Sequence, residues 1–210
     1  MQRLRKGGSQ VGSVPLRTWG VMQTIFPTSL TPEQYVEQNY QEQVQAPEHC
    51  PHCDCLSSLE ALGYYSRFVT QAIATVLTIW VRRFRCRRCR RSVSCLPAFA
   101  QPYRVVNNAT IEAAFNGEHT RPDVQRWWIL LLTYWRRFEA QVPELVRRVG
   151  QALGSLPVRA SARNFWTGCV QESGGLARTT RELIARFRTC LFGTYRCHQP
   201  QQQMRTSRGK

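Results

Sequence analysis

The sequence predicts an α+β fold in which a short β-rich segment precedes a mostly α-helical region. Residues 59–69 and 75–85 are rich in β-branched and aromatic side chains, which is typical of strands. Beyond residue 106, segments that begin at helix-capping residues follow one another to about residue 195. Four of the nine cysteines form two C-x-x-C pairs, and the two predicted strands lie between these pairs.

Residues 1–46 are predicted to be irregular apart from one helix. Gly, Ser, Pro and Thr are frequent up to residue 30, which is typical of chain without regular structure. Thr31 is a candidate N-cap, Pro32 suits the first helical position, and Glu33 lies near the positive end of the helix dipole. We expect this helix to run to about Gln45.

The two C-x-x-C pairs are Cys50 with Cys53 and Cys86 with Cys89. A two-residue spacer lets a tight turn direct both sulfurs of a pair to one point, and two such pairs supply the four thiolates that a structural zinc prefers. A hairpin built from the two predicted strands brings the pairs together. The sequence therefore predicts one zinc ion bound in a small β zinc ribbon over residues 47–105. Four unrelated buried thiols or a redox pair are the alternatives.

Neighbouring cysteines and histidines are expected not to bind this zinc. Cys55 would form a C-x-C unit with Cys53, which is a less usual ligand pair. Further along the chain no fourth ligand completes a second site. These side chains are expected to be thiols or imidazoles without a metal: Cys55, Cys95, His49, His52, Cys190, Cys197 and His198.

The chain is strongly basic, with 29 Lys+Arg against 13 Asp+Glu and a formal net charge of +16. Such a charge favours an anionic partner, above all a nucleic acid. Residues 82–91 hold seven arginines in ten positions, and these are predicted nucleic-acid contacts: Arg82, Arg83, Arg85, Arg87, Arg88, Arg90 and Arg91. The second cysteine turn is expected to contact mainly phosphates, and a solvated strand face and turn is the alternative. Along a strand, Arg83 and Arg85 share one face, and Arg82 shares the other with Phe84. Trp80 is expected to pack the hairpin rather than to stack on bases.

Residues 106–195 are predicted to form a helical domain. A helix that starts at an Asn cap ends at Gly117, and a second one over residues 120–141 has Thr120 and Asp123 in the N-cap and N3 positions. Residues 108–138 thus have the lengths and the break of a helix-turn-helix, although two helices packed in a bundle fit as well. In a helix-turn-helix the second helix would present to the major groove Arg121, Gln125 and Arg126.

Two more helices are predicted in the same domain. Pro143 suits the first turn of one helix. Thr179 and Glu182 form a capping box for the other, which we expect to end at Gly193. The tail over residues 196–210 is polar and is expected to be disordered.

The stretch from Cys50 to Tyr103 resembles the zinc-ribbon head of bacterial insertion-sequence transposases and of related uncharacterised transposon-associated proteins. The resemblance is carried by CPHC, Gly63-Tyr64-Tyr65, RRFRCRRC, Ser92-Val93-Ser94 and LPAFAQPY. It covers about a quarter of the chain strongly and extends weakly into the following helices, which resemble a helix-turn-helix in that family. Arg90 stands where the family usually has glycine. The resemblance implies a DNA-binding role in or near mobile elements, and it does not imply a catalytic role for this chain.

Other classes of protein are excluded by what the sequence lacks. The apolar run WWILLLTYW has nine residues between arginines, whereas a membrane span needs about 20. No secretory signal is visible, so we expect a cytoplasmic, nucleoid-associated protein without a membrane partner. Asp54 and Asp123 are the only aspartates, and neither suits a two-metal carboxylate site. We therefore do not expect an enzyme.

The sequence as a whole predicts a zinc-ribbon protein that binds DNA, resembles transposases and lacks a catalytic core of its own. A separate transposase subunit is a candidate partner. Two alternatives stay open, because neither a zinc ribbon nor arginines distinguish DNA from other partners. One is an RNA-binding zinc-ribbon protein, and the other is a zinc-stabilised module for protein interaction.

Overall fold

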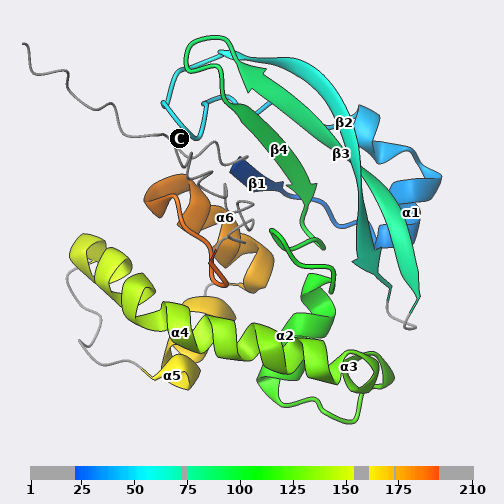
Figure 1. Ribbon diagram of the computed structural model, residues 1–210, viewed down its shortest axis with the longest axis vertical. Coiled ribbons are helices and arrows are strands. Elements are labelled where there is room, and N and C mark those ends of the chain that lie inside the picture. Colours follow the sequence, from blue (N-terminus) through cyan, green and yellow to red (C-terminus); the bar gives the residue numbers. More distant parts are fainter. Residues whose placement is uncertain (1–21, 72–74, 154–160, 173, 194–210) are drawn as a thin grey trace, which may run out of the picture.

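The computed structural model describes residues 22–71, 75–153, 161–172 and 174–193, which form a sheet layer and a helical layer (Figure 1). The sheet layer holds four strands and helix α1, and the helical layer holds α2 to α6. In chain order the elements are β1 (Met22–Phe26), α1 (Pro32–Glu37), the 3-10 helix η1 (Tyr40–Glu42), β2 (Leu59–Thr70), β3 (Val76–Cys86), β4 (Ser92–Pro97), α2 (Asn108–Asn116), α3 (Pro122–Arg126), α4 (Trp128–Leu153), α5 (Ala162–Trp166), the π-helical turn η2 (Thr167–Gln171) and α6 (Leu176–Phe187).

The four strands form one mixed sheet in the order β1-β4-β3-β2. β2 and β3 form an antiparallel hairpin, β4 runs antiparallel to β3, and β1 runs parallel to β4. The two strands predicted from the sequence are thus confirmed as β2 and β3. An α+β architecture with a β-rich segment before the helices is confirmed as well.

β1 contradicts the prediction that the chain before residue 47 is irregular apart from one helix; residues 1–21 lie outside the described part. The strand is short, and Met22 pairs with Val93 of β4, far along the chain. A pairing over this sequence separation leaves no local signal. The strand nevertheless contributes Ile25 to the core, where only 4% of this residue is exposed.

Helix α1 begins where the sequence predicts but ends early. Thr31 is the N-cap, and its side chain and that of Gln34 form a capping box. The predicted continuation to Gln45 is wrong, because the helix ends at Glu37 and Asn39 adopts a left-handed conformation with φ of 48°. A short 3-10 turn, η1, follows.

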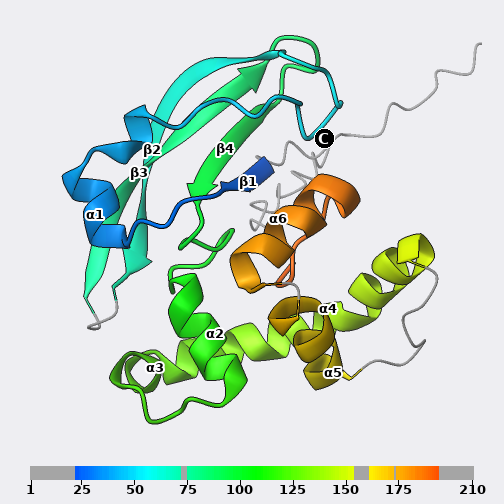
Figure 2. The same cartoon turned by 180° about the vertical axis from the view of Figure 1, so that it is seen from behind.

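The sheet buries different side chains on its two faces, because side chains alternate along each strand. On one face Phe84 packs against Val44 and Cys95, beside η1. The helix α1 lies against β3 (Figure 2). The Tyr35 hydroxyl donates to the backbone carbonyl of Trp80 at 3.0 Å. The larger cluster of the sheet layer includes Ile25, Val69, Ile79, Val81 and Leu96.

In the helical layer, α2 has the predicted bounds, with Asn107 as N-cap and Gly117 in the left-handed region after it. The segment over residues 120–141 is mostly helical as predicted, but it is divided between two helices rather than forming one. α3 ends at Arg126, and Trp127 leaves helical geometry at φ −102° and ψ 12° before α4 begins. Thr120 is not the N-cap, since Arg121 holds that position without a side-chain capping bond.

α4 runs through Pro143, so the prediction that a separate helix starts there is wrong. A proline inside a helix removes one backbone hydrogen bond and usually kinks or ends it. Here an apolar stripe anchors both sides of the proline, because these side chains recur at helical spacing and are buried: Tyr134, Phe138, Val142, Leu145 and Val149. Among the described residues no helix is both long enough and apolar enough to cross a membrane.

The predicted capping box of the last helix is wrong as well. α6 begins at Leu176 after Gly175, and Thr179 lies one turn inside it, where its hydroxyl donates to the Gly175 carbonyl at 2.9 Å. The helix ends at Phe187 rather than at Gly193. The tail expected over residues 196–210 lies outside the described residues. α5 and η2 complete the layer without having been predicted.

Buried polar contacts fix the connection between the two layers. Asn107 donates its side-chain amide to the Thr70 carbonyl at 2.9 Å, and its oxygen accepts the Thr110 N–H at 2.9 Å. The Thr70 N–H in turn donates to the Val105 carbonyl at 2.9 Å. Arg104, 1% exposed, donates to the Phe192 carbonyl at 2.8 Å. Because each group is buried and paired, the end of β2 and the start of α2 hold one relative position.

We expect Asn107→Ala to lower the free energy of unfolding by about 2–4 kcal/mol, because the variant loses a helix cap and leaves buried backbone groups of Thr70 and Thr110 without their partner. Urea denaturation followed by circular dichroism measures this change. Asn107→Asp keeps the capping oxygen but loses the donor to Thr70, so we expect an intermediate effect. Equal unfolding midpoints for Asn107→Ala and the exposed control Asn164→Ala would contradict the role of this junction.

Candidate metal centre

The first C-x-x-C pair forms a tight turn in the loop before β2. The Cys50 N–H donates to the Cys55 carbonyl at 3.0 Å, and the Asp54 N–H donates back to the Cys50 carbonyl at 2.8 Å. Closing this turn requires a left-handed residue, and Asp54 has φ of 58°. Aspartate tolerates this region better than most residues other than glycine.

The second pair repeats the same turn between β3 and β4. The Cys86 N–H donates to the Arg91 carbonyl at 2.9 Å, and the Arg90 N–H donates to the Cys86 carbonyl at 2.9 Å. Arg90 is again left-handed, with φ of 60°. This conformation explains why a glycine suits the position, since a side chain there costs about 1–2 kcal/mol. The turn nevertheless forms with arginine at this position, and both of its hydrogen bonds are made.

The two turns lie at one end of the sheet (Figure 1). They bring four sulfurs together. The sulfurs of Cys50, Cys53, Cys86 and Cys89 all lie within 4.8 Å of one another. Two of the distances are 3.8 Å, between Cys50 and Cys89, and 3.6 Å, between Cys53 and Cys86. A tetrahedral zinc with Zn–S bonds of about 2.3 Å separates its sulfurs by about 3.8 Å. The cluster predicted from the sequence is thus confirmed, and its donors fit zinc.

The pKa values of the four thiols differ because their surroundings differ. Burial raises the pKa of Cys50 to about 12. Burial also opposes ionisation of Cys86, but the Cys89 N–H donates to its sulfur at 3.4 Å, the Ser58 hydroxyl lies 3.2 Å from the same sulfur, and the pKa of Cys86 is lowered to about 6. Four thiolates this close repel one another, so a divalent cation is the natural counter-charge for the fully ionised set. Ser58 is a contributor that the cysteine spacing does not reveal.

The other cysteines and histidines lie outside the group of four sulfurs. Cys55 donates its thiol to the Cys53 carbonyl at 3.7 Å, and Cys95 is buried beside Phe84. His52 accepts from Arg91 at 3.1 Å. His49 lies 3.7 Å from the Asp54 carboxylate, and Cys190 is buried near α6, whereas Cys197 and His198 lie outside the described residues. Burial and the positive charges of Arg91 and Arg188 lower the pKa of His52, so its imidazole is neutral.

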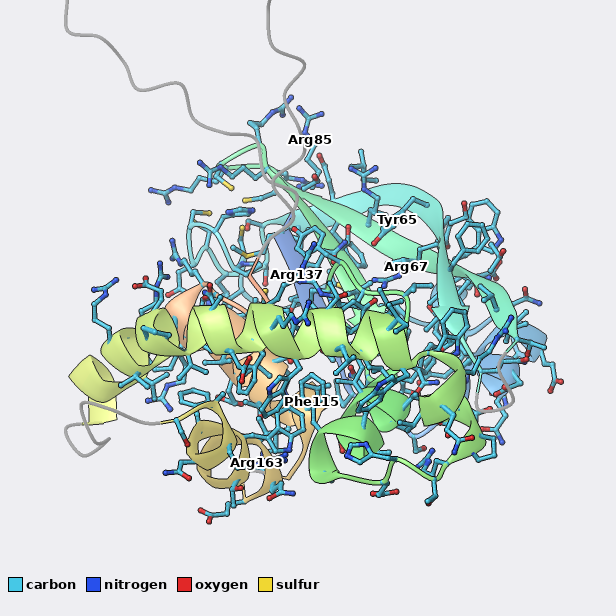
Figure 3. The ribbon with its side chains drawn as sticks, turned by 60° about the horizontal axis from the view of Figure 1, so that its bottom comes forward. Tyr65, Arg67, Arg85, Phe115, Arg137 and Arg163 are labelled. Carbon is cyan, nitrogen blue, oxygen red and sulfur yellow. The ribbon has the colours of Figure 1, made fainter. Side chains whose placement is uncertain are left out.

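The arginine run surrounds this end of the sheet, and its members differ in their partners. Arg87 forms an ion pair with Glu60 at 2.9 Å. Arg82 and Arg83 lie over tyrosine rings, Arg82 at 5.0 Å from the centroid of Tyr64 and Arg83 at 5.9 Å from that of Tyr65. Of the seven arginines only Arg87 has a carboxylate partner among the described residues, and Arg91 contacts His52. In the described part of the chain, Arg85, Arg88 and Arg90 have neither an ion pair nor a ring contact of this kind. Figure 3 shows Arg85 pointing outward, whereas Arg67 lies deeper, between the sheet and α4.

Trp80 contradicts the expectation that it packs the hairpin, since 51% of it is exposed while Phe84 is buried. Strand periodicity places Trp80 on the same face as Arg82 and Phe84. However, it does not show that neighbouring elements cover that face at Phe84 and leave it open at Trp80. The opening is a property of the packing of η1 and α1, which the local sequence does not encode.

Of the three side chains predicted for the groove-reading helix, Arg121 is committed to an internal contact. Its guanidinium donates to the Asp123 carboxylate at 2.9 and 3.1 Å, and Thr110 donates to the same carboxylate at 2.6 Å. Burial opposes ionisation of Asp123, but these bonds hold its pKa below the ordinary value. Gln125 and Arg126 are exposed on α3.

We expect the protein purified under reducing conditions to hold about one equivalent of zinc. Cys86→Ser should abolish stoichiometric binding and unfold this end of the sheet, because the bound metal contributes folding free energy. Zinc displaces thiol protons, so the affinity should fall as the pH is lowered. Metal analysis and competition with a chromophoric chelator measure both effects. Full zinc content in Cys86→Ser, with Cys55→Ser as the matched control, would contradict this set of ligands.

We also expect Arg90→Gly to raise the free energy of unfolding of the zinc-loaded protein by about 0.5–1 kcal/mol, because glycine removes the left-handed strain but adds entropy to the unfolded chain. Arg88→Gly, in the same turn but without a positive φ, should instead lower it by a similar amount. Urea unfolding of both variants provides the test, and a loss of stability in Arg90→Gly equal to that in Arg88→Gly would refute the role of this conformation.

Comparison with known proteins gives a similarity to one family model over part of the chain, and no activity. Residues 50–127 match a family model described as a domain of unknown function, DUF6431. No curated protein and no solved structure matches the chain. The matched residues contain the four clustered cysteines, β2 to β4, α2 and α3. The similarity to DUF6431 therefore lies in the cysteine-bearing sheet and the first helices of the helical layer.

Proposed function

We propose that the cysteine cluster binds zinc and that the arginine-rich end of the sheet binds nucleic acid, with DNA as the main partner. The observation that carries this proposal is the one-sided charge of this part of the chain. No acidic residue occurs between Glu60 and Glu112, whereas this stretch contains nine arginines. Seven of them follow one another around the second cysteine turn, where the fold exposes or half-exposes all of them.

The net charge of this surface stays positive when the metal is counted. Zinc with four thiolates carries a net charge of −2, which offsets part of the arginine charge. Glu60 neutralises Arg87. The remaining arginines still outnumber these negative charges, so the surface attracts a polyanion. Because the second cysteine turn is short and blunt, its side chains suit phosphates rather than base edges.

Contacts to base edges would come from a different part of the molecule. Gln125 and Arg126 are exposed on α3, so they are the proposed groove contacts of a helix-turn-helix built from α2 and α3. Arg121 is a weaker candidate, because a base contact would compete with its bonds to Asp123. The proposal thus assigns most of the affinity to the sheet end and sequence preference to α3.

We propose a binding role rather than catalysis. In the described part of the chain, the four cysteines are the only group of three or more Cys, His, Asp or Glu side chains placed to hold a metal. The resemblance of the cysteine turns to transposase zinc ribbons supports a protein associated with mobile elements. Strand transfer would then be the task of a separate transposase subunit.

Neutralising the unpaired arginines should weaken binding of all DNA sequences alike. We expect a variant with Arg85→Ala, Arg88→Ala and Arg90→Gly to lose affinity and to flatten the log–log salt dependence by about 0.9 per lost phosphate contact. Glycine at position 90 keeps the left-handed turn, so the charge is removed without damage to the zinc site. Fluorescence anisotropy with labelled duplex DNA, at several salt concentrations, measures both quantities.

A second variant controls for the total charge of the protein. Arg136→Ala, Arg178→Ala and Arg186→Ala remove the same charge from exposed positions of the helical layer. We expect this control to keep most of the affinity and the full salt slope. If the two variants lose equal affinity, charge location does not matter and the proposal fails. The same titrations against structured RNA and against heparin distinguish DNA binding from binding of any polyanion.

A further inference from the structure

Three large aromatic side chains are exposed on the β2–β3 hairpin. The exposed fractions are 41% for Tyr64, 63% for Phe68 and 51% for Trp80. Aromatic rings in a sheet are normally buried, because each contributes 150–250 Å² of mostly apolar surface. Three of them exposed on one hairpin form a surface that is suited to a partner.

The strand register places the three rings on one face. Tyr64 pairs with Arg82, Ser66 with Trp80, and Phe68 with Thr78. Residues that pair directly point to the same side of an antiparallel sheet, and alternate residues of a strand share that side. Trp80 is therefore the diagonal neighbour of both Tyr64 and Phe68, at about 7–8 Å. The rings form a zigzag row, with spacing that lets each ring contact a separate flat group.

The charge around this row favours an anionic ligand. Arg82 lies at one end, with its guanidinium 5.0 Å from the centroid of the Tyr64 ring. Beyond it the hairpin leads to the arginine-rich turn, and neither strand carries an acidic residue on this face. On the other side the row borders α1, whose acidic residues Glu33 and Glu37 would repel phosphates. A bound polyanion would hence follow the row toward Arg82.

We propose that this face, the aromatic row of Tyr64, Trp80 and Phe68, binds unpaired nucleotides of single-stranded nucleic acid. The inference rests on the proposed nucleic-acid binding and specifies its ligand. Flat bases stack on aromatic side chains regardless of sequence, and the backbone phosphates bind nearby arginines. A duplex keeps the faces of its bases stacked inside, so it cannot use such a row. The arginine-rich turn contacts phosphates of either form, whereas the aromatic row distinguishes single strands from duplexes.

The test compares a labelled oligo(dT) of about 12 nucleotides with a duplex of the same length. The full chain, loaded with zinc, is measured by fluorescence anisotropy as wild type and as the double variant Phe68→Ala and Trp80→Ala. Each lost stacking contact should weaken single-strand binding by about 5-fold or more. We expect duplex binding to change by less than about 2-fold, because phosphate contacts remain. Trp80→Phe should keep most of the single-strand affinity.

Ile129→Ala is the matched control, since Ile129 is an exposed apolar residue, 77% exposed, on α4 of the other layer. Wild-type levels of single-strand binding in the double variant, with an unchanged zinc content, would overturn the aromatic row as a binding site. Equal losses for single strand and duplex would also overturn it. Self-association of the wild type that disappears in the double variant would assign the row to a second copy of the chain instead. If wild type binds neither nucleic acid, the proposed function itself fails, and this outcome is distinct from the others.

Discussion

The meeting of four cysteine sulfurs at one end of the sheet is the constraint on which the rest of the sheet layer depends. Both cysteine turns are short and half-exposed, and the second one also carries four arginines that repel one another. A common metal ion bound by the four sulfurs would join the two turns across the hairpin and fix the beginning of β2 against the end of β3. The same ion would hold the arginines of the second turn on a rigid base rather than on a flexible tip. Without the ion, the four cysteine thiols would lie close together with no positive charge between them. The two turns would then have no cross-link.

A second constraint acts at the other end of the hairpin. The buried contacts of Asn107 with Thr70 and Thr110 tie β2 to α2, while Arg104 reaches the segment after α6. These bonds involve backbone carbonyls and N–H groups, and thus set distances and directions more narrowly than apolar packing does. The two ends of the hairpin differ, with the four clustered cysteine sulfurs at one end and the polar junction at the other. Its open face between them is therefore presented in one orientation.

The parts of the fold that the sequence predicts correctly are those with local causes. The strands β2 and β3 and the helix α2 carry their own composition, caps and turns, and the four cysteines carry their spacing. β1 was missed because its partner Val93 is distant in sequence, and the path of α4 through Pro143 was missed because a buried stripe outweighs the proline. The capping box at Thr179 failed because the helix had already begun at Leu176. At the site, the spacing of the cysteines predicts which four sulfurs lie together. The contact of Ser58 with Cys86 and the exposure of Trp80 depend on tertiary packing, so the local sequence does not reveal them.

The left-handed arginine at position 90 links the stability of the fold to the charge of its surface, and this has an evolutionary consequence. Every arginine codon is one nucleotide change away from a glycine codon. The backbone at this turn would be relaxed by that change, whereas the positive surface would lose one member. Position 90 is thus a point where a single mutation shifts the balance between a more stable protein and a more strongly charged one. Relatives with glycine at this position would have the more stable turn, whereas the present chain has the more strongly charged surface.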